Sequence, residues 1–159
     1  MSEVINLLKH DHKLVAEKLN SLEKDIHRKP EEGFPSIIET LEFFKTFVFV
    51  GHHQRESEIL YAWMAKQSGS SDTLIIDRIN LEHTNLEKLS LKILQNCQDF
   101  LNKKGSLSAT GILDDLTTLV YDYNDHMTKE EKFIFMIAES LNLSASDEAA
   151  MVLKIKKTY

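Results

Sequence analysis

The chain is poor in the residues that break helices or cross-link small folds. Its 159 residues include two prolines, five glycines and one cysteine, Cys97. A single cysteine cannot form a disulfide within the chain, and it excludes a cysteine-rich zinc or iron–sulfur site. Cys97 falls on an apolar stripe, so we interpret it as a core thiol. The scarcity of proline and glycine favours few, long helices.

Charge and hydropathy argue against two classes of partner. The formal net charge is -6, and the 19 basic residues are dispersed along the chain. Nucleic acids and anionic membranes both attract a concentrated basic patch, so we expect neither as a partner. No segment is long and uncharged enough to be a transmembrane helix, and the first residues do not resemble a secretory signal. We therefore expect a cytoplasmic protein.

Hydrophobic residues recur at helical spacing in four long segments. With 42% hydrophobic residues, the chain can form one domain with its own core, which we place over residues 1–159. Alternating steps of three and four predict helices over about residues 2–27, 35–67, 72–103 and 108–141. A shorter amphipathic segment predicts a fifth helix at about 145–157. The expected fold is all-α, an up-down-up-down antiparallel four-helix bundle over about 2–141 with this fifth helix outside.

Ionisable residues interrupt each of the four hydrophobic stripes at core positions. They are His12 in the first predicted helix, His52 and Glu56 in the second, His83 in the third, and His126 and Glu130 in the fourth. The order of a lone histidine followed by an HxxxE pair occurs twice, which indicates one helical hairpin used twice. Two hairpins related in this way would bring all four stripes to one centre.

A shared metal would explain why such residues are buried. An unpaired carboxylate or imidazolium is costly to bury, so a group of them needs a common partner. Residues at i and i+4 lie about 5 to 6 Å apart on one helix face, so each HxxxE pair can bind the same or adjacent cations. Two glutamates could bridge two metals about 3.5 to 4 Å apart. Imidazole and carboxylate ligands with open positions favour iron, while manganese and zinc fit less selectively.

Four short motifs carry these residues. They are Asp11-His12, HHQRESEILY at 52–61, LEH at 81–83 and HMTKEEKFIF at 126–135. Together they resemble the hemerythrin-like family of HHE cation-binding domains, over roughly residues 5–140. The resemblance implies a four-helix bundle that holds a non-haem di-iron centre with a bridging oxygen and meets dioxygen, nitric oxide or peroxide. By motif, the implied ligands are His12, His52, Glu56, His83, His126 and Glu130.

Neighbouring residues leave two choices open. His53 could replace His52, but only His52 has a glutamate four residues later, which favours His52. Oxygen-carrying hemerythrins place the last carboxylate five residues after the fourth-helix histidine, where this chain has Glu131, whereas the stripe favours Glu130. Those proteins also have a second histidine four residues after the third-helix ligand. This chain has Glu87 there.

Other polar residues lie near the stripes. His27 is a candidate for a fifth histidine of the kind found in iron–sulfur repair proteins, although a helix end also favours a solvent-exposed histidine. Tyr123 precedes His126 on one stripe, so its hydroxyl could hydrogen-bond a ligand at the metal; packing with a backbone partner is the alternative. His10 lies on the opposite face from the stripe and is expected in solvent. The candidates for orienting the imidazoles are Asp11, Asp122 and Asp125, although solvated helix faces are the simpler interpretation of these aspartates.

Three functions are compatible with these residues. The first is a di-iron protein that binds or senses a diatomic oxidant, dioxygen or nitric oxide, or handles iron. The second is an enzyme, such as an iron donor for repair of iron–sulfur clusters under nitrosative or oxidative stress, or a peroxide or nitric oxide reductase. The third is a metal-free helical interaction module in which histidines pair with carboxylates. The sequence leaves open whether the protein is an enzyme.

Overall fold

The computed structural model describes residues 2–67, 69–104 and 107–158. Within these ranges the chain is helical apart from short turns, and none of the helices is both long and apolar enough to cross a lipid bilayer. The helices are α1 (Glu3–Ile26), α2 (Pro30–Phe43), η1 (Phe44–His52), η2 (Arg55–Tyr61), α3 (Ala62–Gln67), α4 (Ser70–Leu101), α5 (Ala109–Lys129), η3 (Glu130–Ile134), α6 (Phe135–Ser140) and α7 (Ala145–Lys156).

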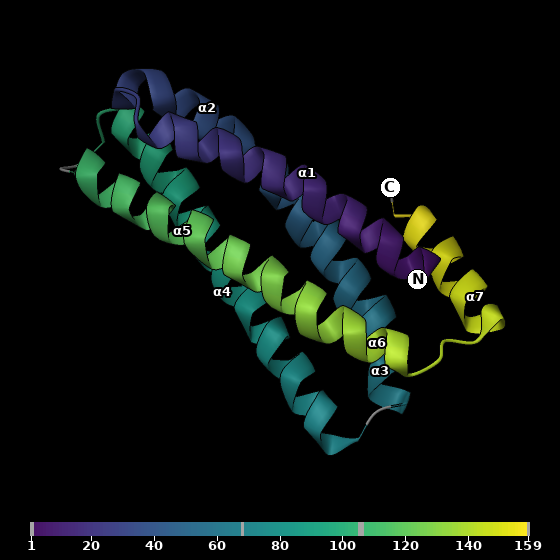
Figure 1. The fold of residues 1–159 in the computed structure, drawn as a ribbon. Helices are drawn as coiled ribbons and strands as arrows, with labels where there is room; N and C mark the ends of the chain where they lie inside the picture. Colours follow the sequence, from purple (N-terminus) through teal and green to yellow (C-terminus); the bar gives the residue numbers. More distant parts are fainter. Residues whose placement is uncertain (1, 68, 105–106, 159) are drawn as a thin grey trace.

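The long helices pack side by side as a bundle (Figure 1). Helix α1 contacts α2 and α5, and α4 contacts the same two helices, so each long helix has two neighbours. Helix α7 lies against the first turns of α1 at one end of the molecule. The predicted helical bundle is confirmed.

The apolar core is divided into two clusters of buried side chains. One cluster contains Leu19, Phe34 and Phe44, and the other contains Leu8 and Phe135. Along every long helix, the histidine at a core position falls between residues of the first cluster and residues of the second. The polar centre is therefore a layer across the bundle with apolar packing on both sides.

The second helix begins earlier than the sequence predicts. We expected a start near Pro35, but α2 begins at Pro30 and Pro35 lies inside it. Proline suits the first turn of a helix because its missing N–H needs no partner there, and Pro30 meets that requirement. A Cβ at Gly33 would lie 2.7 Å from the carbonyl oxygen of Asp25, so glycine allows α2 to turn back closely on α1.

Three stretches of the bundle, η1, η2 and η3, are π-helical. In a π-helix the backbone N–H bonds to the carbonyl five residues earlier rather than four, and such turns are frequent at functional sites. The wider turn reduces the rotation between successive residues. His52, at the end of η1, and His53, directly after it, are both buried. Glu56 and Glu130 also lie in π-helical turns.

Candidate metal centre

The structure brings the six predicted site residues together in the middle of the bundle. None of them is more than 6% exposed. Helix α1 contributes His12, η1 contributes His52, η2 contributes Glu56, α4 contributes His83, α5 contributes His126 and η3 contributes Glu130. Four separate segments of the chain therefore converge on one layer.

Glu130 faces histidines on two sides. Its Oε2 lies 3.2 Å from Nε2 of His12. Its Oε1 lies 3.1 Å from Nε2 of His83 and 3.3 Å from Nε2 of His126. The two oxygens of this carboxylate are thus directed at different imidazoles.

Glu56 has the same arrangement. Its Oε1 lies 3.3 Å from Nε2 of His52 and 3.7 Å from Nε2 of His12. Its Oε2 lies 3.3 Å from Nε2 of His83. Both glutamates therefore stand between one pair of imidazoles, His12 and His52, and a second group that includes His83.

The possible ligand atoms fall into two neighbouring groups in the described part of the chain. One contains His12, His52, Glu56 and Glu130, and the other contains His53, His83 and His126. Within each group the ligand atoms lie within 4.8 Å of one another. Either group could hold a cation.

His53 is the residue that the sequence analysis placed least well. We treated His52 and His53 as alternatives, yet both are buried at the centre. The ring of His53 stacks on that of His83, with centroids 3.8 Å apart and planes 8° from parallel. Burial lowers the pKa of His53 well below its ordinary value, and the neighbouring His83 lowers it further, so the imidazole is neutral. A neutral imidazole can bind a metal without first losing a proton.

The buried polar atoms at the centre fit a cation. Nε2 of His12, Nε2 of His126, both oxygens of Glu56 and Oε2 of Glu130 have no hydrogen-bond partner among the described residues. Each of these atoms nevertheless lies 3.2 to 3.7 Å from an imidazole nitrogen or a carboxylate oxygen of the centre. Ligands bound at about 2.0 to 2.2 Å to a common ion are separated by about 3 to 3.5 Å. The atoms therefore surround one common space at the spacing of metal ligands.

Carboxylates hold the outer nitrogens of three imidazoles. Nδ1 of His52 lies 3.1 Å from Asp11, Nδ1 of His12 lies 2.9 Å from Glu131, and Nδ1 of His126 lies 3.1 Å from Glu82. A carboxylate at Nδ1 fixes the proton there and turns the Nε2 lone pair inward, which is the usual support of a metal-binding histidine. Asp11 lies where the sequence predicts an orienting carboxylate. Asp122 and Asp125 are exposed instead, and Glu82 and Glu131 take their places.

Without a cation the centre is held by ion pairs. Burial lowers the pKa of His12, but the neighbouring carboxylates, Glu130 first, outweigh this effect and raise the pKa to about 11. Burial also opposes the charge of His126, yet Glu130 raises its pKa to about 10. Burial alone would raise the pKa of Glu130, but the charge on His126 and hydrogen bonds from the imidazoles hold it well below its ordinary value. At neutral pH the centre contains imidazolium–carboxylate pairs.

Two tyrosines border the centre, and only one reaches a glutamate. The hydroxyl of Tyr61 donates a hydrogen bond to Oε1 of Glu130, and burial raises the pKa of this phenol well above its ordinary value. Tyr123, the predicted candidate, is buried with its ring 6.5 Å from that of His126, but its hydroxyl makes no hydrogen bond to either glutamate among the described residues. The sequence analysis missed Tyr61. It lies five residues after Glu56, which is the spacing of the backbone hydrogen bonds in a π-helix.

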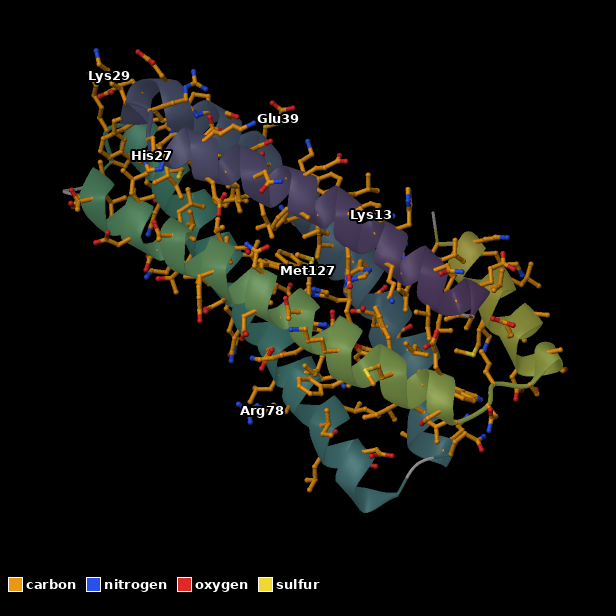
Figure 2. All side chains as sticks on the ribbon, in the orientation of Figure 1. Lys13, His27, Lys29, Glu39, Arg78 and Met127 are labelled. Carbon is orange, nitrogen blue, oxygen red and sulfur yellow. The ribbon has the colours of Figure 1, made fainter. Side chains whose placement is uncertain are left out.

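His27 and His10 lie outside the centre. His27 caps the end of α1, is exposed, and stands near the turn that leads into α2, at the end of the bundle away from α7 (Figure 2). The structure therefore does not bring it to the other histidines, because the centre lies in the other half of α1, around His12. His10 is exposed, as expected.

Buried imidazoles and carboxylates from several helices, directed at one shared space, define a cation-binding helical bundle. A family model, the hemerythrin HHE cation binding domain, matches residues 3–138. The chain belongs to this family, whose domains bind metal cations. No curated protein and no solved structure matches the chain.

Proposed function

We propose that the protein is a non-haem di-iron protein. His12 and His52 hold one iron, His53, His83 and His126 hold the second, and Glu56 and Glu130 bridge the two. The observation that carries this proposal is the position of the glutamates, since each directs one oxygen at His12 and the other at His83. The proposal includes one domain over residues 1–159 and the up-down-up-down order of the four long helices.

Iron is the metal that best suits this donor set. The set contains five imidazoles, two carboxylates and no thiolate, because Cys97 is buried in the apolar cluster around Phe44. Imidazole and carboxylate donors with open positions are typical of non-haem iron, while manganese and zinc remain weaker alternatives. Two iron ions would supply one-electron chemistry and open coordination positions for a small molecule.

The ligand that we propose is a diatomic oxidant, dioxygen or nitric oxide, which the protein binds or senses. Two of the surface pockets are each lined by one imidazole of the centre. One, of about 440 Å³, lies between α1 and α5 and is lined by His12, together with Lys13 and Met127, which Figure 2 labels on these two helices. The other, of about 280 Å³, lies between α4 and α5 and is lined by His126. Both reach an imidazole of the centre, which supports access by a small ligand.

A second candidate function is iron donation for the repair of iron–sulfur clusters. His53 favours it, because the centre then contains the five histidines that the resemblance to repair proteins requires. The candidate for the fifth histidine in the sequence is His27, which is exposed, and His53 takes that place in the proposal. A metal-free interaction module is disfavoured because the six predicted site residues are buried and several of their polar atoms have no hydrogen-bond partner among the described residues.

Iron loading followed by ligand addition tests the proposal. We expect the protein, purified without oxygen and reconstituted with ferrous iron, to bind about two irons per chain. Oxygen, nitric oxide or azide should then produce a visible absorption band. A colourless protein without stoichiometric iron would support the metal-free module. Restoration of a damaged iron–sulfur enzyme by the iron-loaded protein, and not by the metal-free protein, would favour the repair function over ligand binding.

A further inference from the structure

Arg55, the first residue of η2, is a charged side chain removed from water. It is 2% exposed, and Asp11 on α1 is 0% exposed. Nη2 of Arg55 donates a hydrogen bond to Oδ2 of Asp11 at 2.8 Å. A Cβ at Gly51 would lie 3.4 Å from Nη1 of Arg55, so the glycine leaves room for the guanidinium. Desolvating a guanidinium is expensive, so its bonding partners fix its position closely.

Asp11 connects Arg55 to the proposed metal centre. Its Oδ2, the same atom that accepts from Arg55, accepts a hydrogen bond from Nδ1 of His52 at 3.1 Å. With the proton on Nδ1, the lone pair of His52 is on Nε2, which lies 3.3 Å from Oε1 of Glu56. The position of one carboxylate oxygen therefore sets the direction of His52.

The other side of the guanidinium contacts Thr158, which follows the last turn of α7. Nη1 of Arg55 lies 3.5 Å from the carbonyl oxygen of Thr158 and 3.4 Å from its Oγ1. Helix α7 contacts α1 and η2 and lies beside the first turns of α1 (Figure 1). Its buried residues Met151, Val152 and Ile155 share an apolar cluster with Leu8. Arg55 thus spans from α7 to the carboxylate that orients His52.

We propose that Arg55 is a positioning residue that couples the docking of α7 to cation binding at His52. This inference rests on the proposed function, because it requires a cation on Nε2 of His52. Such a cation would hold the imidazole in the orientation that keeps Nδ1 on Asp11. Asp11 would then hold Arg55 where Thr158 accepts its hydrogen bonds. The bound metal therefore makes α7 harder to detach, and the docked helix makes the metal harder to release.

The coupling is reciprocal and has a measurable size. Any factor by which the metal strengthens the docking of α7 must equal the factor by which docking strengthens metal binding. Coupling between sites commonly amounts to between 5-fold and 150-fold, and we expect about tenfold here. Helix α7 is therefore the part of the chain whose local opening should report the state of the metal centre.

Hydrogen exchange of backbone amides measures this coupling. Amides of α7 are compared with those of α2 in the full chain, without metal and with saturating ferrous iron under anaerobic conditions. Helix α2 reports the general stabilisation that any bound metal gives. We expect iron to slow exchange in α7 about tenfold more than in α2.

Three variants separate coupling from simple packing. Arg55→Lys keeps the charge beside Asp11 but loses the planar guanidinium that bonds to Asp11 and Thr158 at once. Thr158→Ala removes the hydroxyl that accepts a hydrogen bond from Arg55. Both should reduce the extra slowing in α7, and Arg55→Lys should need about tenfold more iron for half saturation. Lys156→Met is the matched control, since it removes the exposed 2.8 Å bond between α7 and Glu3 without touching Arg55. In Lys156→Met, iron should still slow amide exchange in α7 more than in α2.

The outcomes distinguish this inference from the proposed function. If the protein binds two irons but α7 slows no more than α2, the coupling is wrong and the di-iron proposal stands. The same conclusion follows if iron slows exchange in α7 relative to α2 as strongly in Arg55→Lys and Thr158→Ala as in the unmodified protein. If the protein binds no iron, both the proposed function and the coupling are overturned.

Discussion

Glu130→Gln is expected to remove both metal ions rather than one. Glu130 directs Oε2 at His12 and Oε1 at His83 and His126, so its carboxylate serves both groups of histidines. Glutamine has nearly the same shape but no charge, and its amide nitrogen cannot act as a bridging donor. At iron concentrations that saturate the unmodified protein, we expect bound iron to fall from about two per chain to near zero. Metal analysis after gel filtration measures this loss.

Glu131→Gln is the matched control, because it makes the same chemical change at the next residue. Glu131 is 43% exposed and contacts Nδ1 of His12 rather than the shared space. Loss of such a supporting carboxylate commonly weakens metal binding about 10-fold to 100-fold without removing the site. We expect Glu131→Gln to bind two irons at saturation. If Glu131→Gln lost both ions and Glu130→Gln kept them, the bridge would be assigned to the wrong glutamate.

The overall constant for binding both ions is expected to rise about 100-fold for each unit of pH near neutrality, which is about tenfold for each ion. The pKa of His12 is raised to about 11 and that of His126 to about 10, so both imidazoles carry a proton on the metal-free protein at pH 7. A metal binds only the neutral imidazole, so each chain must release both protons. His83, whose pKa is also raised by the glutamates against the effect of burial, can add to this release.

The stability of the metal-free protein should change with pH in the opposite direction. A raised pKa in the folded state means that the charged histidine stabilises the fold. For His12 this contribution is fully present below its ordinary pKa of 6.5 and is lost as the pH rises towards about 11. Thus high pH favours metal binding while it weakens the metal-free fold.

Calorimetric titration of the metal-free protein checks the proton count. Ferrous iron is added without oxygen between pH 6.5 and 7.5, in buffers with different enthalpies of ionisation. The dependence of the heat on the buffer should give at least two protons released per chain. Release of fewer than one proton would mean that the histidines are neutral before the metal arrives, and that the ion pairs with Glu130 do not hold.

The helical fold was predictable because its signals are local. Few prolines and glycines and long stripes at steps of three and four predicted a helical bundle, and the family match and structure agree. The start of α2 was not predictable from spacing alone. Pro30 and Pro35 both satisfy the rule for a first turn, and the closeness of Gly33 to Asp25 that allows the earlier start is a contact between two helices.

The candidate centre was predictable only in part. Polar interruptions of apolar stripes predicted six of the seven histidines and glutamates that lie together in the described part of the chain. His53 was weighed only as an alternative to His52, because a regular α-helix turns neighbouring residues to different faces. Tyr61 was missed because its spacing from Glu56 fits the π-helical η2 better than an α-helix. Glu82 and Arg55 were missed for another reason. Their roles depend on His126, Asp11 and the end of α7, which lie far from them along the chain.

X-ray diffraction from iron-loaded crystals, with data collected on both sides of the iron absorption edge, tests the central claim most directly. The account predicts two anomalous peaks per chain, about 3.5 to 4 Å apart, in the layer between the two apolar clusters. Each of Glu56 and Glu130 should contact both peaks. One peak only, or two peaks that share neither glutamate, would contradict the account.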